Sequence, residues 1–184
     1  MRRIAAFLTI FAILAAPSAA EITVHLDTPA SDIQLQRSGD YLIVALADGV
    51  SRAAPGAPDL PLRSLPVVLP LGAVVTGVTV AGEERVLAGD AMLQPYQPSR
   101  ASGSEPPPLV PPDAASYADA AILPQRRAVI GSECRIRGHR IAQLRLAPLR
   151  YLPAERRLLH SPRLTVTISY QQDLMLESVE SVEP

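Results

Sequence analysis

Residues 163–170 read Arg-Leu-Thr-Val-Thr-Ile-Ser-Tyr, and here apolar and polar side chains alternate more strictly than anywhere else in the chain. Alternation with a period of two is typical of a β-strand that buries one side and exposes the other to water. Residues 139–146, His-Arg-Ile-Ala-Gln-Leu-Arg-Leu, largely repeat the pattern. Short segments at 147–152 and 156–160 follow, with a Pro-Ala-Glu turn between them. The C-terminal part of the chain therefore predicts a run of short strands.

The N-terminal half shows the same strand pattern. Residues 21–26, 33–36 and 41–46 are alternating or apolar, and glycine-containing turns follow the last two of them. We expect these three segments to form a β-meander. Residues 54–66 are punctuated by prolines, which lack an N–H donor, so this block predicts extended edge or polyproline II segments. Residues 73–80 are rich in β-branched side chains and predict another strand.

Many short strands, Gly/Pro turns and no helical crossovers indicate an all-β fold, an antiparallel β-sandwich with Greek-key-like or meander connections. We expect residues 21–172 to form one domain. Within it, residues 94–124 contain a Pro-rich stretch and predict an exposed excursion. Residues 173–184 are acidic and predict a frayed tail.

The first 20 residues have the composition of a signal peptide. Arg2 and Arg3 precede an apolar run of about 13 residues, shorter than the roughly 20 that a membrane-spanning helix needs. Small residues, Ser18 and Ala20, then occupy the positions that a signal peptidase reads, so we expect cleavage between Ala20 and Glu21. The alternative, a membrane anchor, is less favoured. This predicts a secreted, periplasmic or cell-envelope protein that does not associate with the membrane after the signal peptide is removed.

Composition argues against several function classes. The net charge is −1 and aromatic residues make up only 4% of the chain, so nothing favours a nucleic-acid partner. A single cysteine, Cys134, rules out a framework of intrachain disulfides.

No convincing catalytic centre or metal site is apparent in the sequence. Cys134 lies near His139, and Arg135 and Arg137 could lower its thiol pKa, but a half-buried structural cysteine is the better interpretation. The three histidines, His25, His139 and His160, lack metal-ligand spacing. We therefore expect no catalytic residues, no metal and no cofactor.

Three stretches together resemble a known family. Residues 56–61 running into 69–78 are similar to a "G-x-P-x-L-P" pattern followed by "LP-x-G-A-x-V", and residues 93–98 to a segment rich in proline and glutamine. Residues 138–151 resemble "G-x-R-x-A-x-L-x-L-x-P-x-x-Y". In this order they resemble the N-terminal propeptide of gingipain-type cysteine peptidases, secreted bacterial zymogens. The resemblance implies a β-sandwich that binds a cysteine peptidase domain, assists its folding and keeps it inactive until cleavage.

The chain departs from the family in one respect. The peptidase domain, with the catalytic His and Cys, would follow the propeptide, yet this sequence stops at Pro184. Two interpretations stay open: a stand-alone protein acting in trans, or the front of a truncated precursor, itself a cysteine endopeptidase, acting in cis. An Ig-like interaction module of the cell envelope, unrelated to proteolysis, is the alternative function.

Arg126 and Arg127, after the stretch Ile-Leu-Pro-Gln, are the candidate inhibitory residues. If the partner prefers arginine, an exposed guanidinium could enter its specificity pocket and pair with an acidic group there, as a pseudosubstrate. The alternative is a solvated charge at the boundary between a loop and a strand.

Overall fold

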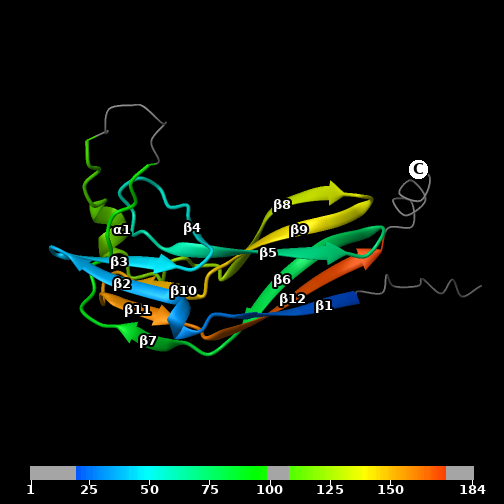
Figure 1. Cartoon of the computed structure of the whole chain (residues 1–184), viewed down its shortest axis with the longest axis horizontal. Coiled ribbons are helices and arrows are strands. Elements are labelled where there is room, and N and C mark those ends of the chain that lie inside the picture. Colours follow the sequence, from blue (N-terminus) through cyan, green and yellow to red (C-terminus); the bar gives the residue numbers. More distant parts are fainter. Residues whose placement is uncertain (1–19, 99–107, 173–184) are drawn as a thin grey trace, which may run out of the picture.

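Antiparallel β-strands account for most of the computed structural model, which describes residues 20–98 and 108–172 and is drawn in Figure 1. The predicted all-β class is confirmed. The strands are β1 (Ala20–Asp27), β2 (Ile33–Ser38), β3 (Tyr41–Leu46), β4 (Gly49–Ser51), β5 (Pro61–Leu69), β6 (Ala73–Ala81), β7 (Arg85–Ala88), β8 (Ala128–Ile136), β9 (His139–Leu146), β10 (Leu149–Leu152), β11 (Arg157–His160) and β12 (Arg163–Gln172). Two short helices accompany them, η1 (Ala30–Asp32) and α1 (Ala114–Ala118).

Two sheets packed face to face form the main sandwich. Sheet I has the strand order β1-β12-β6, and sheet II has the order β4-β5-β9-β8. In Figure 1 they form the lower and upper layers on the right. Alternate residues of each sheet point inward and build one core cluster, whose buried members are Val67, Leu144, Leu146, Leu164, Val166 and Ile168. The alternation in residues 163–170 thus marks the central strand of sheet I, as expected of a strand with one buried face.

A second core lies at the other end of the molecule, between the β2-β3 hairpin and the β10-β11-β7 sheet. Its largest side chain is Tyr151, which is fully buried, and its hydroxyl donates a 2.7 Å hydrogen bond to the carbonyl of Ala91. Because a buried hydroxyl needs a partner, this bond ties the segment between β7 and α1 to the core.

The predicted N-terminal meander is wrong in one respect. β2 and β3 form a hairpin, but β1 pairs with β12. Ile22, Val24 and Leu26 pack against the main core from β1, and their register partners all belong to β12. Asp27 and Arg163 close this strand pair with a 2.6 Å ion pair. Burial of one complete apolar face therefore outweighs pairing with the nearest segment.

The proline block forms β5 and the loop before it. Pro61 pairs only with β4, and Pro66 pairs only with β9. Each proline therefore lies where the strand has a single neighbour, so the missing N–H donor need not disrupt a ladder.

Segments of the predicted excursion, 94–124, pack on the domain where the structure describes them. The Gln97 side chain donates to and accepts from the backbone of Val110. Asp113 caps α1 by accepting from the Ser116 amide, and the Tyr117 hydroxyl donates to the Leu93 carbonyl at 2.6 Å. Burial raises the pKa of Tyr117.

The predicted signal peptide, apart from Ala20, and the predicted tail lie outside the described residues. Within the described ranges no helix is long and apolar enough to cross a membrane.

Candidate functional site

The segment that carries both candidate arginines is a loop leading into β8, and its backbone is held at two points. Leu123 and Tyr151 exchange backbone hydrogen bonds of 2.8 and 2.7 Å, and the peptide bond between Leu123 and Pro124 is cis. The Ala147 amide donates to the Arg127 carbonyl at 2.8 Å. The loop is therefore anchored to β10 and to the end of β9.

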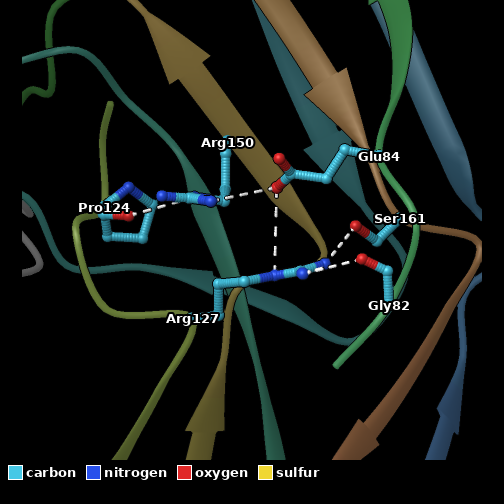
Figure 2. Close-up of polar contacts among 6 residues, drawn as sticks. All are labelled: Gly82, Glu84, Pro124, Arg127, Arg150 and Ser161. Carbon is cyan, nitrogen blue, oxygen red and sulfur yellow. Dashed lines mark hydrogen bonds and ion pairs between the residues drawn. The ribbon is translucent and has the colours of Figure 1, made fainter. Parts of the chain in front are cut away.

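Arg127 lies inside the structure. Its side chain is only 15% exposed. Nη1 donates to the Gly82 carbonyl at 2.9 Å, and Nη2 donates to the Ser161 hydroxyl. Figure 2 shows both of these groups at the tip of the guanidinium, and the Glu84 carboxylate beside Nε. Arg127 thus joins three segments that are distant in the sequence.

Glu84 is shared between two arginines. Its carboxylate lies 3.8 Å from Arg127 Nε and 3.2 Å from Arg150 Nη1, while Arg150 Nε donates to the Pro124 carbonyl at 3.3 Å. Burial lowers the pKa of Arg127, the Glu84 carboxylate opposes this, and the Arg150 charge lowers it further. A guanidinium stays protonated at physiological pH in any case, so the network holds two cations around one carboxylate.

Arg126 has the opposite environment. It is exposed, and none of the described residues offers it a hydrogen bond or an ion pair. It lines a groove of about 570 Å³ between the edges of the two sheets, together with Val78 and Val80 of β6 and the first residues of β8. The two adjacent arginines therefore have different environments. The side chain of Arg127 is held by hydrogen bonds and an ion pair, and the side chain of Arg126 is exposed.

This arrangement can present the Arg126 guanidinium on a fixed backbone. The residues that fix it, Gly82, Glu84, Arg150 and Ser161, were not identified from the sequence. They come from three separate parts of the chain, with only Gly82 and Glu84 close in sequence, and belong to no motif. The only sequence signal was the presence of charged residues within apolar stretches, which does not say which charges meet.

The other predicted positions lie elsewhere. Cys134 is exposed on β8, so the predicted half-buried position is wrong. Cys134 pairs with Ile141, whereas His139 pairs with Ile136, so the cysteine and the histidine are not cross-strand partners. His160 is buried, with Nε2 2.8 Å from the Thr28 carbonyl oxygen. No group of His, Cys, Asp or Glu in the described parts of the chain could hold a metal ion. Ala20 and Glu21, the predicted cleavage junction, begin β1 and pair with Tyr170 and Ser169 of β12.

Comparison with known proteins finds a matching family and solved structures of similar fold. The family model described as Propeptide_C25 matches residues 15–180. No curated protein matches the chain. Among solved structures, the "Complex of Porphyromonas gingivalis RgpB pro- and mature domains" is similar with a TM-score of 0.63 and 17% identity, over 88% of this chain and 81% of that chain. A structure concerning "zymogenic latency of gingipain K from Porphyromonas gingivalis" is similar with a TM-score of 0.63 and 20% identity, over 85% of this chain and all of that one. At these identities the structures show a shared fold.

Proposed function

The chain belongs to the Propeptide_C25 family, the propeptides of gingipain-type cysteine peptidases, and from this premise we propose that it binds such a peptidase domain and keeps it inactive. In this proposal Arg126 enters the substrate cleft as a pseudosubstrate, and Arg127 holds the loop in place. The chain has no catalytic activity of its own, and it acts outside the cytoplasm. It also assists the folding of the peptidase domain.

The partner is proposed from the two similar structures. One is a complex of pro- and mature domains, and the other concerns zymogenic latency. A cysteine peptidase domain, attached in cis or separate in trans, is therefore the partner that we expect here. The family match favours this hypothesis over an envelope module unrelated to proteolysis.

The contrast between Arg126 and Arg127 is the observation that carries the inhibitory part of the proposal. An exposed arginine without partners can pair with a carboxylate in a specificity pocket, through two parallel hydrogen bonds. The backbone on either side is fixed by the Leu123–Tyr151 and Ala147–Arg127 bonds. A loop that is already ordered loses less conformational entropy on binding, which strengthens inhibition.

An inhibition titration tests the proposal. Each mature C25-family peptidase domain encoded by the source organism is assayed on an arginyl peptide substrate while the purified chain is added. We expect at least one peptidase to lose activity in a saturable manner, and the chain alone to hydrolyse nothing. If every peptidase keeps its full activity at micromolar concentrations of the added chain, the proposed function is wrong.

A further inference from the structure

β8 is an edge strand, and its second half is open to pairing with a further strand (Figure 1). In sheet II it pairs with β9 on one side, and no described strand pairs with it on the other. Residues 128–130 line a groove together with side chains of β6. Residues 132–136 lie beyond that groove, and all of them are exposed. An edge of this kind presents backbone N–H and C=O groups to which another strand can add.

The turn after β8 fixes the hydrogen-bonding phase of the strand. Ile136 pairs with His139 across two turn residues. Those residues, Arg137 and Gly138, have φ angles of 51° and 81°. Two successive residues with positive φ are typical of the type I′ hairpin turn, whose flanking residues form a hydrogen-bonded pair. Ile136 and His139 are therefore a hydrogen-bonded pair of the β8-β9 ladder.

The alternation of the ladder then determines which residues of β8 direct their backbone groups to the open edge. Hydrogen-bonded and non-hydrogen-bonded pairs alternate along an antiparallel ladder. Cys134, two residues before Ile136, consequently directs its N–H and C=O toward β9. Glu133 and Arg135 occupy the alternate positions, so their backbone groups point away from β9. A strand that adds to this edge forms its hydrogen-bonded pairs at these two residues.

The side chains of this segment are complementary to a second copy of themselves. A twofold axis beside the edge places β8 antiparallel to β8 of the second copy. An axis at Glu133 or at Arg135 would set two like charges directly opposite each other, which destabilises a strand pair. An axis at Cys134 instead sets Glu133 of each copy opposite Arg135 of the other. Opposite charges in these positions stabilise the pair, so the charge pattern selects the axis at Cys134.

We propose that two copies of the chain associate non-covalently through β8, antiparallel, with Cys134 of each copy at the twofold axis. The two copies of sheet II then form one continuous sheet, joined at β8. Because the strands are antiparallel, the two Arg126 segments lie toward opposite ends of the pair. The inference goes beyond the proposed function and does not depend on it, since it uses contacts between copies of this chain alone.

Disulfide trapping tests the axis directly, because Cys134 is the only cysteine of the chain. In a non-hydrogen-bonded antiparallel pair the Cα atoms lie about 4.5 Å apart, which is within the range that a disulfide bridges. The purified chain is treated with copper phenanthroline in air, quenched and analysed by non-reducing electrophoresis. We expect a covalent dimer to form about tenfold or more faster than by random collision, because pairing raises the effective concentration of the two thiols.

The matched control moves the thiol along the same strand. In Ser132→Cys/Cys134→Ser the thiol also occupies an exposed position, but the proposed axis keeps the two copies of it apart. This variant should be trapped only at the collision rate. Residue 132 of one copy faces residue 136 of the other, so mixing the control with Ile136→Cys/Cys134→Ser should restore rapid trapping.

Charge-swap variants test the pairing without the thiol. In a Cys134→Ser background, Glu133→Arg and Arg135→Glu each set like charges opposite each other in their own dimer. Each should weaken self-association about tenfold or more. A mixture of the two variants sets Arg opposite Glu at both positions and should associate at least as tightly as the Cys134→Ser chain. Analytical ultracentrifugation measures the dissociation constants, and melting temperatures check that each variant is folded.

Every outcome of these experiments supports or overturns the inference. If the Cys134→Ser chain stays a monomer up to millimolar concentration, the inference is wrong. If the chain dimerises but the Ser132→Cys control is trapped as fast as the native thiol, or the mixed charge variants do not associate, another surface holds the dimer and the inference is also wrong. The inhibition titration is a separate measurement, so the proposed function stands or falls independently of these results.

Discussion

Arg127 donates a 2.9 Å hydrogen bond from Nη1 to the carbonyl of Gly82, a residue 45 positions earlier in the chain. Gly82 follows β6 directly, and Arg127 precedes β8. The bond therefore ties the edge of sheet I to the edge of sheet II beside the loop that presents Arg126. Because Arg127 also donates to Ser161, one side chain fixes the geometry of the proposed inhibitory segment.

The two adjacent arginines should separate inhibition from stability. Arg126→Ala should raise the inhibition constant by about ten- to hundredfold, the worth of a charge-assisted pair, with no change in the melting temperature. Arg127→Ala should lower the free energy of unfolding by about 1–3 kcal/mol because it removes two hydrogen bonds and leaves buried partners unsatisfied. Urea denaturation and inhibition titrations measure the two effects. If the Arg126→Ala chain inhibits the peptidase as well as the parent chain does, the pseudosubstrate hypothesis is wrong.

Glycine is required at position 82 for a steric reason. A Cβ there would lie 2.5 Å from the carbonyl oxygen of Arg163, a backbone atom that cannot move without shifting β12. Gly82→Ala should therefore destabilise the fold by about 1–3 kcal/mol, as overpacking does. A Cβ added at Gly77, also on β6, would meet nothing within 4 Å, so Gly77→Ala is the control and should be neutral or slightly stabilising. Thermal unfolding of the two variants compares them, and an equal melting temperature would contradict this account of Gly82.

Asp59 should lower the stability of the domain at neutral pH. Burial raises the pKa of its carboxyl group, a hydrogen bond from Ser51 opposes the shift, and Oδ1 has no hydrogen-bond partner within the described structure. A raised pKa in the folded state means that the folded chain favours the protonated form. Stability relative to an uncharged residue is therefore full below the ordinary value of 3.8 and falls as the pH rises through the folded-state pKa.

Asp59→Asn tests this pH dependence. The variant should melt higher than the parent at pH 7, by at most about 2–4 °C because partial exposure screens the carboxylate. The difference should shrink as the pH is lowered toward the ordinary pKa. Asp40→Asn, in the exposed turn between β2 and β3, should show no such difference. A gain that is independent of pH would show that burial of the Asp59 charge is not its cause.

Strands with a regular side-chain pattern could be predicted from the sequence, and strands without one could not. Residues 163–170 and 139–146 alternate and became β12 and β9. β8 was missed because a bulge between Ile130 and Ser132 breaks its alternation and because its outer half is rich in charged residues. β4 has only three residues, too few to show a period.

The pairing of strands that are distant in the sequence could not be predicted. The alternation of side chains in β1 would be the same whether β1 paired with β2 or with β12, so the local sequence does not identify the partner strand. The prediction of the candidate site was limited for the same reason. Arg126 and Arg127 were indistinguishable in the sequence, and only contacts with Gly82 and Ser161 assign one to the interior.

The central claim, that the Arg126 segment occupies the substrate cleft of a cysteine peptidase, is tested most directly at the catalytic thiol of the partner. The rate at which iodoacetamide alkylates that cysteine is followed by mass spectrometry of the peptidase, with excess parent chain or excess Arg126→Ala chain. The account predicts strong protection by the parent and much weaker protection by the variant at the same concentration. Alkylation at the rate of the free peptidase in the presence of a saturating, co-eluting parent chain would contradict it.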